Sequence, residues 1–148
     1  MKGDKMKKYS IIFAAVFIVS SFLTGIAFAE EPVVTQPDQV ILYCFCTDFC
    51  CPGCVNIKKW TKQVVEADFK DHSASGKLTV KEVNIFSKGN EHFMDDYEIC
   101  TNAIVLVLVK DGKEIKFTNL ARIWCYVCCQ EKFKPYIKDS ISKYVQEL

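Results

Sequence analysis

Residues 40–55 read VILYCFCTDFCCPGCV, a strand–turn–helix pattern from which we infer the fold. Its first part, residues 40–46, is apolar and rich in β-branched and aromatic residues, which indicates a buried strand. A turn follows, and Pro52 then fits the first turn of a helix, where a missing N–H costs nothing. Cys51 and Cys54 therefore lie between a strand and the start of a helix.

The rest of the chain continues the alternation of helices and strands. We expect a helix at about 54–71, followed by a strand at 78–85 whose Leu78 and Val80 point inward. A short helix at 91–97 comes next, and then two strands, 104–109 and 114–117, joined by a hairpin at Asp111-Gly112. The chain ends with a short helix at about 120–127 and a last helix that ends at Leu148. The order β-α-β-α-β-β-α predicts an α/β fold of the thioredoxin-like type, a central mixed β-sheet flanked by helices. Both tryptophans, Trp60 and Trp124, are expected in its core.

The first 29 residues have the layout of a secretory signal peptide, with four lysines, an apolar run over 11–28 and small residues at Ala27 and Ala29. Residues 30–39 then read as an extended linker and 40–148 as one thioredoxin-like domain. We expect an exported protein, periplasmic or extracellular, with no membrane span once the leader is cleaved. The alternative is an anchor retained through residues 9–28, because about 18 to 20 apolar residues can span a bilayer.

Charge and cysteine content narrow the function. The formal net charge is +1, and no basic face stands out, so we expect no nucleic-acid partner. The chain has nine cysteines, all beyond the leader. An odd number leaves at least one outside any intramolecular disulfide. A domain of this size does not need disulfides to fold, so the cysteines point to chemistry as well as structure.

The spacing Cys51-x-x-Cys54 suits thiol chemistry. Cys51 lies at a helix N-terminus, where exposed N–H groups stabilise a thiolate. Cys54 lies one turn inside and can resolve a mixed disulfide. We predict that these two are the catalytic residues of a thiol–disulfide oxidoreductase that requires no cofactor. Its partner is expected to be a disulfide-bearing or dithiol protein of the cell envelope. The alternatives for Cys51 and Cys54 are an inert disulfide or half of a zinc site.

Beyond the motif, residues 40–148 resemble the ArsF family of thioredoxin-like proteins, often described as subunits of a nitrophenyl compound nitroreductase. The matching stretches are Cys51-x-x-Cys54, Gly76-Lys77-Leu78, Asn90-Glu91-His92-Phe93 with Tyr97, Val105-Leu106-Val107, Lys110-Asp111-Gly112-Lys113, and Asn119-Leu120 with Ile123-Trp124. The resemblance implies the thioredoxin-like fold. The chain has no flavin-binding signature, so we expect thiol chemistry.

Three departures from thioredoxins are visible. The order of Pro52 and Gly53 is the reverse of theirs. No proline stands before the central strand, near Ile104, where thioredoxins have a cis-proline facing the active cysteines. The buried acid of thioredoxins falls near Phe45, so its role as proton acceptor is vacant.

The other cysteines are also placed where thioredoxin-like folds carry their active end. Cysteine replaces the residues typical of the ArsF family at Cys46, Cys50, Cys128 and Cys129. We expect these four, with Cys100 and Cys125, to cluster around the motif as a second redox pair, a soft-metal or metalloid site, or structural disulfides. Such a metal site would hold a thiophilic ion, zinc or Cu(I), or an Fe–S centre. Cys44 is expected to be a small buried hydrophobe.

Overall fold

The computed structural model describes residues 37–49 and 51–148. The predicted signal peptide 1–29, its cleavage site, residues 30–36 of the predicted linker and Cys50 lie outside these residues. The first strand begins at Gln39, the last residue of the predicted linker.

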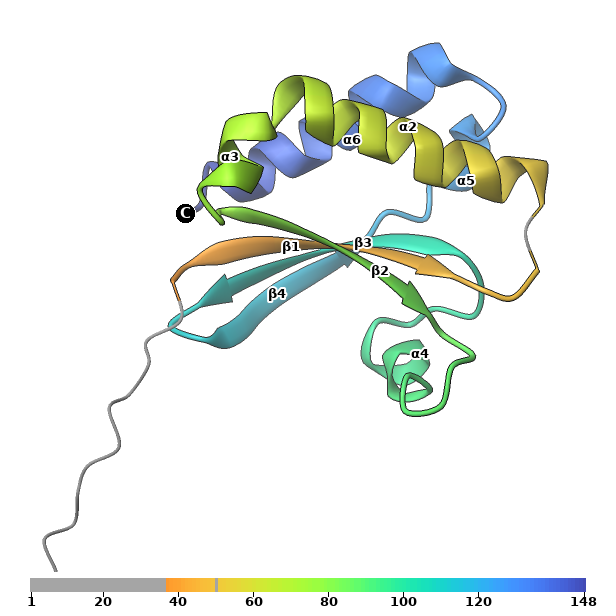
Figure 1. The fold of residues 1–148 in the computed structure, drawn as a ribbon, viewed down its shortest axis with the longest axis horizontal. Coiled ribbons are helices and arrows are strands. Elements are labelled where there is room, and N and C mark those ends of the chain that lie inside the picture. Colours follow the sequence, from red (N-terminus) through yellow and green to blue (C-terminus); the bar gives the residue numbers. More distant parts are fainter. Residues whose placement is uncertain (1–36, 50) are drawn as a thin grey trace, which may run out of the picture. The chain divides into compact units, whose positions relative to one another are not determined.

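Four strands form one mixed sheet in the order β2-β1-β3-β4. Their bounds are β1 Gln39–Cys46, β2 Leu78–Asn84, β3 Ala103–Lys110 and β4 Lys113–Asn119. β1 runs parallel to β2 and antiparallel to β3, and β3 pairs antiparallel with β4 (Figure 1). Asp111 and Gly112 have φ of 50° and 74°, as a tight hairpin needs. The predicted α/β fold, a central mixed β-sheet flanked by helices, is confirmed, and β4 is an edge strand of that sheet.

Helices cover both faces of this sheet. Their bounds are α2 Pro52–Asp68, α3 Lys70–Ala74, α4 His92–Asp96, α5 Ile123–Tyr126 and α6 Gln130–Val145. Figure 1 shows α2, α5 and α6 on one face and α4 on the other. None of the helices in the described part of the chain is long and apolar enough to cross a membrane.

The alternation of side chains along β1 divides the core into two layers. Val40 and Leu42 belong to the larger layer, beneath α2 and α6, and Cys44 packs against it. Tyr43 and Phe45 belong to the smaller layer, on the side of α4. The larger layer is sealed by the inward face of α6, where Phe133, Ile137 and Ile141 are fully buried.

Three local predictions are wrong. The helix expected over 54–71 begins at Pro52 and breaks at Phe69, whose φ of −129° leaves the helical region. Val80 is 41% exposed, because β2 is an edge strand that α2 does not fully cover. Trp124 is 38% exposed, because α5 is a single turn that buries only Ile123. Trp60, in contrast, is buried as expected.

Two isoleucines test how the core is distributed. We predict that Ile137→Ala lowers the free energy of unfolding by about 2–5 kcal/mol, because it opens a cavity in a fully buried site. Ile115→Ala is the matched control: Ile115 is 57% exposed on β4, so its loss should change stability by only about 0.5 kcal/mol. Denaturant unfolding under reducing conditions measures both. Equal losses would contradict the assignment of α6 to the core.

Candidate functional site

Cys51 caps the N-terminus of α2. Its backbone is extended, with φ −86° and ψ 162°, and Pro52 is the first helical residue. The Cys51 Sγ accepts a hydrogen bond from the backbone N–H of Cys54 at 3.2 Å. The sulfur therefore takes the place of the side-chain oxygen that usually caps a helix.

The two sulfurs of the motif have different environments. Cys51 is exposed, whereas Cys54 is 7% exposed. Hydrogen bonds from the Cys54 thiol, and then from backbone N–H groups of Cys54 and Gly53, lower the pKa of Cys51 below its ordinary value. An exposed thiolate can meet a substrate, whereas the buried thiol lies one turn further along α2.

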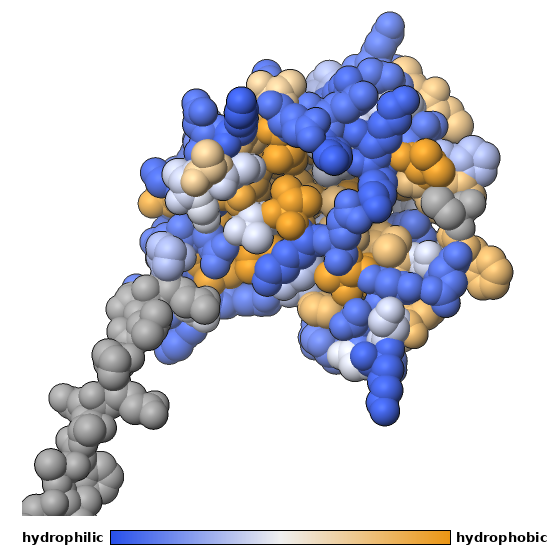
Figure 2. Space-filling model, in the orientation of Figure 1, coloured by the Kyte–Doolittle hydropathy of each residue, from blue (hydrophilic) through white to orange (hydrophobic). Residues whose placement is uncertain are grey.

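A cavity of about 400 Å³ lies behind Cys54, between β1 and α2. Three cysteines line it, Cys44, Cys46 and Cys54, together with Lys58 and Glu82. A neighbouring hollow shares Cys44, Lys58 and Glu82 and reaches the edge of β2. Figure 2 shows apolar surface between the charged side chains of α2 and those of β2.

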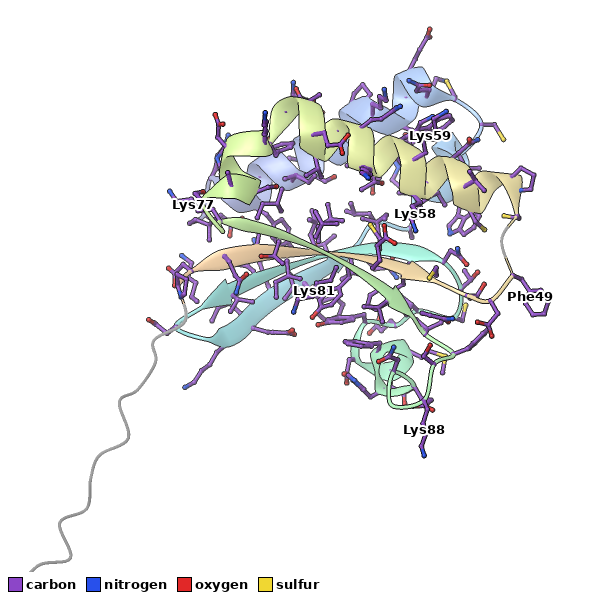
Figure 3. The ribbon with its side chains drawn as sticks, viewed as in Figure 1. Phe49, Lys58, Lys59, Lys77, Lys81 and Lys88 are labelled. Atoms are coloured by element: carbon purple, nitrogen blue, oxygen red, sulfur yellow. The ribbon has the colours of Figure 1, made fainter. Side chains whose placement is uncertain are left out.

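An ion pair bridges the mouth of this cavity. Lys58 Nζ lies 2.5 Å from Glu82 Oε2, and Figure 3 shows Lys58 pointing from α2 toward the sheet. No local pattern in the sequence predicts this ion pair. Register explains the partner, since Glu82 pairs with Cys44 across the parallel strands β1 and β2.

Cys44 is the chemical opposite of Cys51. Burial, followed by the negative charge of Glu82, raises the pKa of Cys44 to about 12, although Lys58 partly offsets this. Cys44 is therefore a neutral thiol at physiological pH. This agrees with the expectation of a small hydrophobe packed against the core.

The loop before β3 also borders the cavity. Asn102 is 6% exposed and lines it, and its Oδ1 lies 3.1 Å from Thr47 Oγ1 at the end of β1. Cys100 is exposed in the same loop, two residues earlier. Asn102 thus occupies the approach to the central strand, whereas Ile104, the position matched to the cis-proline of thioredoxins, is fully buried in the core.

The side chain of Phe45, the position matched to the buried acid of thioredoxins, packs on the α4 side of the sheet. Its ring stacks on that of Tyr43, with 5.2 Å between the ring centroids, and lies 5.3 Å, centroid to centroid, from the ring of Phe93 in the layer next to α4. Among the residues that line the cavity with Cys54, the carboxylate is that of Glu82.

The turn between α5 and α6 packs directly on the motif. A Cβ added to Gly53 would lie 2.9 Å from Val127 Cγ2 and 3.7 Å from Cys51 Sγ. Asn56 Nδ2 also donates a hydrogen bond to the Val127 carbonyl at 3.1 Å. Cys125 and Cys128 flank Val127 and are exposed, and Cys129 is partly buried. The structure thus brings Val127, which lies between Cys125 and Cys128, against the start of α2.

The metal hypothesis receives no geometric support from the described residues. Within 37–49 and 51–148, no group of three or more His, Cys, Asp or Glu side chains is placed to hold a metal ion. Cys50, a candidate ligand, lies outside this set.

The known proteins that match this chain include solved structures of thioredoxins. No family model matches the sequence, and no curated protein matches it significantly. Among solved structures, Fasciola hepatica thioredoxin is 18% identical with a TM-score of 0.43, covering 72% of this chain and 81% of that one. A Thermus thermophilus thioredoxin is 11% identical with a TM-score of 0.44, covering 71% and 75%. Identities this low transfer no residue role, so every role proposed below rests on the chain's own geometry.

The pH dependence of alkylation tests the environment of Cys51. We predict that Cys51 reacts with iodoacetamide with a midpoint below pH 9.0, its ordinary pKa, because hydrogen bonds favour the thiolate. Cys54→Ala should raise this midpoint more than Cys54→Ser, since serine keeps a side-chain donor. Quenched alkylation with peptide mass spectrometry measures each site, and Cys44 should react only upon unfolding or near pH 12. A midpoint for Cys51 at or above 9.0 would contradict the assigned environment.

Proposed function

We propose that this protein is a thiol–disulfide oxidoreductase in which Cys51 is the nucleophile and Cys54 the resolving thiol. The observation that carries the proposal is the capping sulfur: Cys51 Sγ is exposed and accepts the Cys54 N–H at 3.2 Å, while Cys54 is buried behind it. This asymmetry is what two-step exchange requires, because only one thiol should meet the substrate.

The reaction proceeds in two balanced steps. The Cys51 thiolate attacks one sulfur of a substrate disulfide, forms a mixed disulfide and releases the other substrate sulfur as a thiolate. Cys54 then loses its proton and attacks Cys51 Sγ, which closes the Cys51–Cys54 disulfide and releases the second substrate thiolate. Two electrons pass from the protein to the substrate, and the reverse sequence oxidises a dithiol partner. The exchange uses no cofactor.

The cavity supports the second step. Cys54 needs a base to accept its proton, and Glu82 lines the same cavity. We assign the Glu82 carboxylate, held by Lys58 at 2.5 Å, to this task through water in the cavity. This replaces the acid that thioredoxins carry at the position of Phe45.

The surface around Cys51 suits a protein substrate. Phe49 is 82% exposed just before the motif and points into solvent in Figure 3. Val55, 50% exposed, and Trp124, 38% exposed, add apolar surface on α2 and α5. Exposed apolar side chains beside a reactive thiol favour docking of a polypeptide. We therefore propose a disulfide-bearing or dithiol protein as partner. On the sequence motifs given above, we also propose that the protein belongs to the ArsF family.

Reduction of insulin by dithiothreitol tests this function. We predict that the protein accelerates precipitation of the insulin B chain, and that Cys51→Ser returns the rate to that of dithiothreitol alone, because the nucleophile is lost. Cys54→Ser should stall as a mixed disulfide with insulin, visible on a non-reducing gel. Cys100→Ser is the matched control, since it removes an exposed thiol outside the motif. Full activity of Cys51→Ser would overturn the assignment.

We also propose that the protein works outside the cytoplasm, where disulfides persist. The support is the layout of residues 1–29, with its basic start, apolar run and small residues before Glu30. We predict that protein recovered from the producing cell begins near Glu30 by intact mass. A chain that retains residues 1–29 and pellets with membranes would instead indicate an anchored protein.

A further inference from the structure

We propose that Cys125 and Cys128 form a second redox pair that exchanges its disulfide with Cys51 and Cys54 within one chain. The inference rests on the proposed function of the first pair. It names the reaction partner inside the molecule: a dithiol or disulfide on the turn that packs against Gly53.

The backbone brings Cys125 and Cys128 to disulfide distance. Cys125 lies in α5, and Val127 keeps helical angles of φ −57° and ψ −21°. The Cys129 N–H donates to the Tyr126 carbonyl at 2.8 Å, which holds the turn closed. Residues three apart in such a turn have Cα atoms about 5 Å apart, inside the range of about 4.4–6.8 Å that disulfides adopt.

Cys129 fits this role less well. Its backbone is extended, with φ −134° and ψ 95°, and its carbonyl accepts the Phe133 N–H at 2.9 Å where α6 begins. It is also partly buried, whereas Cys125 and Cys128 are exposed. The pair with both helical spacing and access is therefore Cys125 with Cys128.

The turn that carries the second pair packs on the start of α2. One point, the missing Cβ of Gly53, is 2.9 Å from Val127 Cγ2 and 3.7 Å from Cys51 Sγ. Cys128 is the next residue after Val127, about 3.8 Å further along the chain between Cα atoms. The hydrogen bond from Asn56 to the Val127 carbonyl fixes this turn to α2. The turn that carries the second pair is therefore held next to the start of α2, where Cys51 lies.

The exchange balances without an outside reagent. The Cys51 thiolate attacks Cys128 Sγ of a Cys125–Cys128 disulfide, forms a Cys51–Cys128 disulfide and releases the Cys125 thiolate. Cys54 loses its proton and attacks Cys51 Sγ, which closes Cys51–Cys54 and releases the Cys128 thiolate. The two protons lost by Cys51 and Cys54 are taken up by Cys125 and Cys128. Two electrons move from the first pair to the second, and the reverse moves them back.

The trapped intermediate provides the test. In the full chain carrying Cys54→Ser, the exchange should stop at the first step. After mild oxidation with diamide and acid quenching, peptide mass spectrometry should find Cys51 joined to Cys128 in the same chain. The rate of formation should not change over a tenfold range of protein concentration, because the reaction is intramolecular.

Matched variants separate the alternatives. Adding Cys128→Ser to Cys54→Ser should abolish this cross-link, whereas adding Cys100→Ser should leave its yield unchanged. A cross-link that forms only between chains, or a Cys125–Cys128 disulfide that persists unchanged beside reduced Cys51 and Cys54, would overturn the proposal. If insulin reduction persists in the wild type while the cross-link is absent, only this inference fails. If Cys51→Ser leaves insulin reduction intact, the proposed function fails instead.

Discussion

The hydrogen bond from the Cys54 N–H to the Cys51 sulfur is the interaction on which the site depends. A helix N-terminus leaves backbone N–H groups without partners, and here a thiol supplies one. The bond forms because α2 is held over the sheet by Trp60 and Val64, which bury its inward face. The core thus fixes the helix end, where hydrogen bonds from the Cys54 thiol, and then from backbone N–H groups, lower the pKa of Cys51.

The same sheet gives two cysteines opposite properties. Cys51 is exposed and its pKa is lowered by hydrogen bonds, whereas burial and Glu82 raise the pKa of Cys44 to about 12. Desolvation disfavours the charged form of a thiol, and N–H donors favour it. The domain can therefore hold many cysteines near one another while only selected ones act as nucleophiles at neutral pH.

The exchanged order of Pro52 and Gly53 acquires a physical reason from Val127. Any side chain at position 53 would begin 2.9 Å from the Val127 methyl group, so a larger residue there would have to displace Val127. Proline can occupy position 52 because the first helical residue needs no N–H. The reversed motif thus leaves room for Val127, in the turn between α5 and α6, to pack at the start of α2, and the same turn carries Cys125 and Cys128.

The sequence by itself determined the element order, the sheet and the Cys51-x-x-Cys54 placement, because these follow from local periodicity, turn residues and the helix-starting proline. It also placed Cys44 correctly, since alternation along a strand is a local property. Only the tertiary structure decided that Glu82 faces Cys44, that Phe45 lies on the far face and that Val127 packs on Gly53. Those facts depend on strand register, sheet order and side-chain contacts between residues up to 74 positions apart, which no local pattern encodes.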